Sequence, residues 1–65
     1  MKPNEIRAAL LIRDVRPVEI ANKLEVSRAA VSSVISGKLK SARIQGEIAR
    51  AIGKKVEEIW PGLAA

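Results

Sequence analysis

The chain has 65 residues, a formal net charge of +5 and neither cysteine nor histidine. This length predicts one domain over residues 1–65, and the missing thiols and imidazoles remove the usual catalytic groups and metal ligands, so we expect no enzyme, metal or cofactor. A charge interrupts every apolar stretch before it reaches the roughly 18 residues that a membrane span needs, so we expect no membrane partner. Glu5 lies where a signal peptide would be apolar, so we expect a cytoplasmic, nucleoid-associated protein.

The first half of the chain predicts three helices, because its apolar residues recur at intervals of three and four. We expect a helix from residue 3 or 4 to about residue 12 and another over residues 17–24. Each opens on a proline, whose missing N–H is not needed in the first turn. A third helix is expected over residues 28–36, capped by the hydroxyl of Ser27 and ended by Gly37 in the left-handed conformation.

The second half predicts two more helices. One is expected over residues 42–52, capped by Ser41 and stopped by Gly53, with its apolar residues along one side. A short last helix is expected over residues 56–60. Its Trp60 should pack in the core against the first and fourth helices, with Leu63 packing after it. An exposed Trp60 that stacks on single-stranded bases is the alternative.

Residues 17–36, PVEIANKLEVSRAAVSSVIS, carry the strongest functional signal. The turn between the two short helices is too tight for antiparallel packing, so the helices must cross steeply. Ala21 is small and Val31 is branched, which suits a close crossing. The outward face of the third helix is expected to carry one cation and several hydroxyls, on Arg28, Ala29, Ser32, Ser33 and Ser36. A helix of this length fits a DNA major groove about 12 Å wide.

The positive charge is concentrated in residues 26–46, which contain no acidic residue. Its four cations are Arg28, Lys38, Lys40 and Arg43, whereas the other eight basic residues face seven acidic ones. Such a local field attracts a polyanion such as nucleic acid. An ordinary solvated basic face is the alternative reading of the charge alone.

The chain resembles a known class of regulators. Ile20-Ala21, Leu24, Val26-Ser27, Val31, Val34-Ile35 and Gly37 look like the helix-turn-helix of lambda-repressor-like regulators. IRAALLIRDV and IARAIGKKVEEIWPGL more narrowly resemble the Ner-type phage and bacterial regulators. The resemblance covers nearly the whole chain. It implies a compact all-α domain of five helices, with the helix-turn-helix at the second and third helices. It also implies that the domain acts as a sequence-specific transcription regulator, a repressor of phage or bacterial origin.

Carried over position by position, the resemblance implies two kinds of contact with double-stranded DNA. Base edges would be met by Arg28, Ala29, Ser32 and Ser33. Phosphates would be met by Arg16, Ser27, Ser36, Lys38, Lys40 and Arg43. The chemistry agrees, because arginine can donate two bonds to guanine, alanine can touch a thymine methyl, and the loop cations are long and flexible.

Two positions depart from the family pattern. Glu25 stands where the family usually has glycine, so a residue with a side chain is expected in the left-handed conformation, at a cost of about 1–2 kcal/mol. Pro17 stands where a glutamine often braces the recognition helix and a phosphate. Arg16 is the nearest side chain that can reach the DNA backbone instead.

The expected partners are duplex DNA and a second copy of the chain, as a homodimer on two half-sites about 34 Å apart or a multiple of that spacing. No small-molecule ligand is expected, because the chain has no room for a ligand domain. The main alternative is a protein-interaction module, an antitoxin, antirepressor or adaptor built on the same fold. The acid-free stretch over residues 26–46 favours DNA over that alternative.

Overall fold

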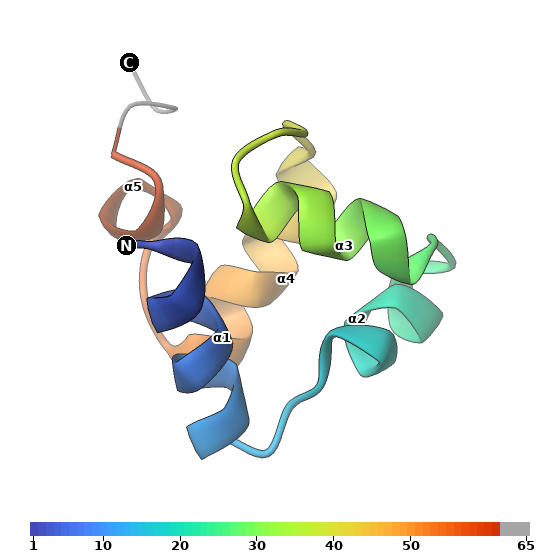
Figure 1. The fold of residues 1–65 in the computed structure, drawn as a ribbon, viewed down its shortest axis with the longest axis horizontal. Coiled ribbons are helices and arrows are strands. Elements are labelled where there is room, and N and C mark those ends of the chain that lie inside the picture. Colours follow the sequence, from blue (N-terminus) through green and yellow to red (C-terminus); the bar gives the residue numbers. More distant parts are fainter. Residues whose placement is uncertain (62–65) are drawn as a thin grey trace.

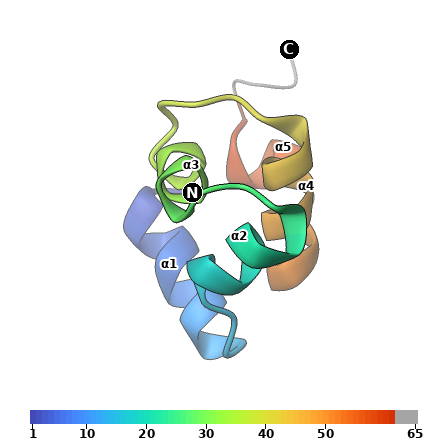
Figure 2. The same ribbon diagram turned by 90° about the vertical axis from the view of Figure 1, so that its right-hand side faces the viewer.

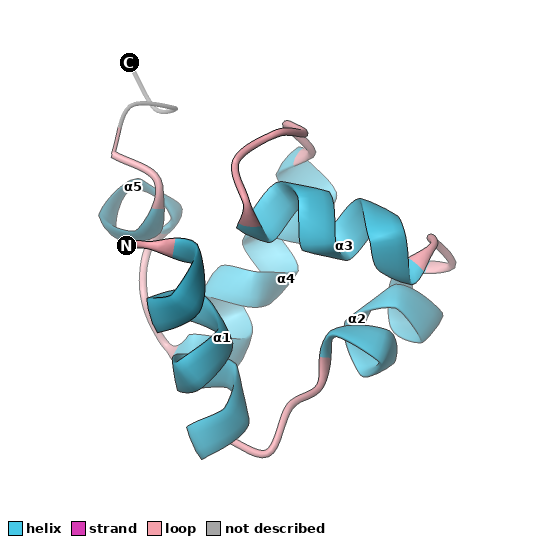
Figure 3. Cartoon of the chain, in the orientation of Figure 1, coloured by secondary structure: helices cyan, strands magenta, loops and turns pink. Residues whose placement is uncertain are grey.

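The computed structural model describes residues 1–61, which form five helices and no strand (Figures 1 and 3). The helices are α1 (Pro3–Ile12), α2 (Pro17–Leu24), α3 (Arg28–Ile35), α4 (Ala42–Ile52) and α5 (Val56–Ile59). The predicted all-α class is therefore confirmed. Helices α3 and α5 end one residue earlier than predicted. Leu63, which was expected to pack against the core, lies outside the described residues.

Most of the helices begin with a side chain that accepts a free backbone N–H. In α1, α2 and α5 a glutamate at the third helical position accepts the N–H of the residue before the helix; the three bonds are Glu5 to Lys2 (2.6 Å), Glu19 to Arg16 (3.3 Å) and Glu58 to Lys55 (3.2 Å). This contact also places a carboxylate at the positive end of the helix dipole. In α3 the predicted cap is confirmed, since Ser27 Oγ accepts the Ala30 N–H at 3.1 Å.

The predicted cap of α4 is wrong. Ser41 precedes the helix, but its hydroxyl makes no capping hydrogen bond. The backbone explains the difference. Ser41 has φ −142° and ψ 110°, whereas the capping Ser27 has φ −75° and ψ 153°, so the Ser41 side chain leaves the helix at another angle and does not meet the first N–H groups. Only its carbonyl continues the helix, by accepting the Gln45 N–H at 2.8 Å.

The helices α1 to α4 all end in the same kind of backbone turn, which contains one left-handed residue. The first residue beyond α2 and α4, and the second beyond α1 and α3, has a positive φ, and it and the next residue donate back to the last turn. These left-handed residues are Asp14 (57°), Glu25 (57°), Gly37 (80°) and Gly53 (70°). The left-handed conformations expected of Glu25 and Gly37 are thus confirmed, and Gly53 ends α4 as predicted. The turns satisfy carbonyls that would otherwise lack partners, and they stop each helix within two residues.

The core lies around α4, which contacts each of the other four helices. Figure 1 shows α1 and α5 on one side of it and the α2–α3 pair on the other. Ala21 and Val31, placed by the sequence at the crossing of α2 and α3, are both buried, and these two helices are in contact. Trp60 is only 7% exposed, which confirms its place in the core and removes the stacking alternative. No helix in residues 1–61 has the length and apolar character that crossing a membrane demands.

Candidate nucleic-acid interface

Helix α3 has one buried side and one open side. Val31, Val34 and Ile35 are buried in the core, while Arg28 and Ala29 are exposed. Ser36, directly after the helix, is exposed as well. Arg28 and Ala29 are neighbours in the chain, and Ser36 follows Ala29 by seven residues, which is about two helical turns, so the three positions lie along one side of α3. We call this side the open stripe of α3. The stripe has little bulk, so another surface can approach the α3 backbone closely.

Ser32 and Ser33 depart from the prediction, because both are half-buried instead of fully outward. Arg7, on α1, reaches Ser32, with its Nη2 at 3.4 Å from the Ser32 Oγ. The carbonyl oxygen of Ser33 accepts the N–H groups of Lys38 and Leu39 at 2.9 and 3.2 Å, so the loop after α3 folds back over the end of the helix. The two serines therefore stand at the rim of the open stripe.

The connection between α2 and α3 is held from a third helix. Arg43, in the first turn of α4, donates from Nη2 to the carbonyl oxygen of Leu24 at 3.1 Å. Leu24 is the last residue of α2, so the bond satisfies one of the free carbonyls at that end. With the Ser27 cap beside it, this bond fixes where α3 begins relative to α2 and α4.

The remaining predicted phosphate contacts lie on two sides of α3. In Figures 1 and 2, α3 lies between the start of α2, where Arg16 precedes the helix, and the loop over residues 36–41. Arg16, Lys38 and Lys40 are exposed. None of them forms an ion pair within residues 1–61, where the single salt bridge joins two other residues. The open stripe of α3 is thus flanked by cations on both sides. We call Arg28–Ile35 together with Arg16, Lys38 and Lys40 the α3 face.

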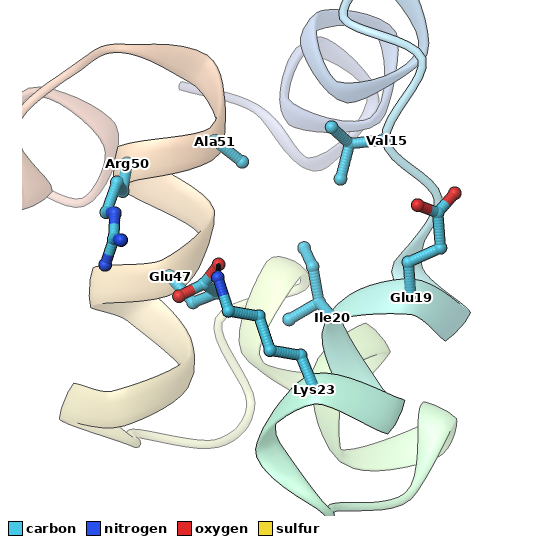
Figure 4. Close-up of a pocket in the computed structure, with 7 residues that line it drawn as sticks. All are labelled: Val15, Glu19, Ile20, Lys23, Glu47, Arg50 and Ala51. Atoms are coloured by element: carbon cyan, nitrogen blue, oxygen red, sulfur yellow. Dashed lines mark hydrogen bonds and ion pairs between the residues drawn. The ribbon is translucent and has the colours of Figure 1, made fainter.

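A second surface, the α2–α4 cleft, has a different charge arrangement (Figure 4). It is an open hollow of about 420 Å³. Lys23 reaches across from α2 to Glu47 on α4, with 2.9 Å between Nζ and Oε2. Glu19 and Arg50 stand at its edges. Each cation of this cleft therefore has an acidic residue in the same lining, which weakens the field that the cleft presents.

Comparison of the chain with protein-family models, curated proteins and solved structures found no match. The functional argument therefore depends on the residues and on their arrangement.

Sequence reasoning missed Arg7. It stands on α1 next to the buried Ile6, and it meets α3 only because the fold brings together residues 25 positions apart. No local pattern in the sequence links it to the third helix. The one signal was its position, since a residue directly beside an inward-facing one on a helix lies at the edge of the packed side and can reach the neighbouring helix.

Proposed function

We propose that the chain is a sequence-specific DNA-binding transcription regulator of the lambda-repressor-like helix-turn-helix class, with α3 as the helix that enters the major groove. The observation that carries this proposal is the α3 face itself. A stripe of small and polar side chains lies between exposed cations, in a stretch of chain without an acidic residue. A polyanion with a groove fits such a surface better than a neutral partner does.

The dimensions of α3 support insertion into the groove. Eight helical residues extend about 12 Å at about 1.5 Å per residue, and the major groove is about 12 Å wide. Arg28 stands at the start of the helix, where it can donate two bonds to guanine O6 and N7, and the Ala29 methyl can touch a thymine methyl. Ser32 and Ser33 are the further base contacts in this proposal.

The flanking residues are proposed to hold the DNA backbone. Arg16 on one side and Ser36, Lys38 and Lys40 on the other can reach phosphates on the two strands that border the groove. Ser27 can donate its hydroxyl hydrogen to a phosphate while its oxygen accepts the capping N–H. Arg43 has further N–H groups beyond the one bonded to Leu24, and these are available to a phosphate.

A short helix makes few base contacts, so we propose that two copies bind two half-sites as a homodimer and act as a repressor of phage or bacterial origin in the nucleoid. Within residues 1–61 only four large apolar side chains are exposed, on Leu11, Ile12, Val18 and Leu39. A stable protein interface buries about 800 Å² on each partner. We therefore expect the second copy to join on the DNA and the free protein to be monomeric.

A protein-interaction module of the antitoxin, antirepressor or adaptor kind is the second candidate. Leu11 and Ile12 favour it, since 73% and 83% of their surfaces are exposed at the end of α1. Such exposure of neighbouring apolar residues is typical of a contact surface. This candidate leaves the acid-free α3 face without a role, which is why we rank it second.

Selection of bound sites from a random duplex library, at a stated salt concentration, tests the proposal. We expect an enriched inverted repeat whose half-sites are about one helical turn apart or a multiple of it. The Arg50→Ala variant is the control, because it removes a cation from the α2–α4 cleft and should select the same repeat. Absence of any enriched sequence, with the protein folded, would contradict the proposal and favour the protein-interaction module.

A further inference from the structure

The contact between Arg7 and Ser32 joins a cation of α1 to the middle of α3. The Nη2 to Oγ distance is 3.4 Å, and neither side chain has another hydrogen-bond partner within residues 1–61. Arg7 is exposed and Ser32 is half-buried. The pair therefore stands at the rim of the α3 face, open to whatever that face binds.

The chemistry of the two groups fixes the direction of the bond. A guanidinium can only donate, so the Ser32 oxygen must accept. One lone pair of the hydroxyl is then occupied, while its hydrogen stays free to donate. A hydroxyl that accepts from a charged donor is polarised toward stronger donation. The positive charge beside it also repels any donor group of a partner and attracts an acceptor.

The same reasoning assigns a preference among bases. In the major groove guanine presents two acceptors, N7 and O6, whereas cytosine presents an N–H donor. A free serine serves either kind of group and selects weakly. Ser32 beside Arg7 differs from such a serine, because a base acceptor opposite it is favoured and a base donor is disfavoured.

Resting on the proposed function, we propose that Arg7 is a specificity-determining positioning residue, which makes Ser32 a hydrogen-bond donor toward base acceptors and so selects guanine over cytosine at the base pair that Ser32 faces. Arg7 acts through Ser32 and not through a phosphate. Its effect is therefore confined to one base pair in each half-site, in contrast to that of the cations in the loop after α3.

The test uses the selected duplex and a panel in which each base pair of a half-site is replaced in turn by the other three. Affinities are measured for the wild type, Arg7→Ala, Ser32→Ala and the double variant. We expect Arg7→Ala to reduce the preference at one base pair by about threefold to tenfold, the size of a single hydrogen-bond effect, and to leave the other preferences unchanged. Ser32→Ala should lose the preference at the same base pair, and the double variant should lose no more than either single variant.

Arg13→Ala is the matched control, since it removes an exposed arginine just beyond the end of α1 without touching α3, and it should keep every preference. Circular dichroism melts verify that each variant is folded. An equal loss of affinity for all duplexes in Arg7→Ala would make Arg7 a phosphate contact and overturn the inference. An Arg7→Ala variant with unchanged affinities would overturn it too. In both cases the proposed function stands. A folded wild type that selects no duplex would overturn both.

Discussion

The α3 face and the α2–α4 cleft carry similar cations in opposite surroundings. In the cleft, Lys23 pairs with Glu47 at 2.9 Å, and other acidic and basic residues line the same hollow. On the α3 face, the chain over residues 26–46 supplies four cations and no acid. The comparison shows that the net charge of +5 says little by itself. A cation contributes most to binding a polyanion where no neighbouring acid offsets its field, and the stretch over residues 26–46 meets that condition along the chain.

The largest expected effect comes from the core beneath the α3 face. Val31→Asp places an unpaired charge at a position that is 0% exposed, which costs several kcal/mol against a folding stability on the order of 5 kcal/mol, so the domain should unfold. Ala29→Asp is the matched control, because Ala29 is exposed on the same helix. It should stay folded and lose DNA binding. Circular dichroism melts measure both, and a helical Val31→Asp variant with a cooperative melt near that of the wild type would show that the crossing of α2 and α3 is misassigned.

Replacing one arginine on the α3 face and one in the α2–α4 cleft compares the two surfaces directly. Arg28→Ala should weaken binding to the selected duplex by about 1–3 kcal/mol and relax the preference at one G·C pair, because a bidentate guanine contact is lost. Arg50→Ala, from the cleft, should change affinity little. Titrations of both variants against selected and scrambled duplexes measure the difference. An equal loss on the two duplexes in Arg28→Ala would make this residue a phosphate contact and leave specificity to the serines or to DNA shape.

The acidic residue directly before the acid-free stretch over residues 26–46 offers a gain of function. Glu25 has φ 57°, which costs a residue with a side chain about 1–2 kcal/mol, so Glu25→Gly should raise the free energy of unfolding by about 1 kcal/mol after the extra chain entropy of glycine is counted. Removing its negative charge should also strengthen DNA binding. Asp14→Gly at the end of α1 is the control. It should stabilise less, since aspartate tolerates this conformation better, and it should not alter binding. Denaturant titrations measure the stabilities, and a destabilised Glu25→Gly variant would refute the strain assigned to this turn.

The smallest expected effect separates two exposed lysines. Lys40→Ala should lower affinity for all duplexes alike and reduce the slope of log K against log salt by about one unit, because one phosphate contact is lost. Lys23→Ala, whose cation is paired with Glu47, should leave the slope unchanged. Titrations at several salt concentrations measure both slopes. Equal slope changes in the two variants would mean that the DNA does not distinguish the two surfaces.

The sequence predicts the helices well because their signals are local. Prolines open α1 and α2, Ser27 caps α3, and glycines end α3 and α4, so every helix boundary falls within one residue of its prediction. At Ser41 the predicted boundary is right but the predicted capping bond is wrong, since capping depends on backbone angles that the residue type alone does not set.

The surroundings of the candidate site were less predictable, because they depend on contacts between distant residues. Arg7 meets Ser32 across 25 positions and Lys23 meets Glu47 across 24. The partial burial of Ser32 and Ser33 follows from such packing. Their spacing therefore predicted which side of α3 they lie on but not how exposed they are. The left-handed Asp14 likewise carries no distinctive sequence signal, since glycine is the usual residue there.

Amide chemical-shift mapping with the selected duplex tests the central claim most directly, since it compares the two surfaces in one titration of the wild-type protein. We expect the largest shifts in α3 and in the loop over residues 36–41, with small shifts at Lys23, Glu47 and Arg50. Large shifts in the α2–α4 cleft together with an unchanged α3 would contradict the claim that the α3 face binds DNA.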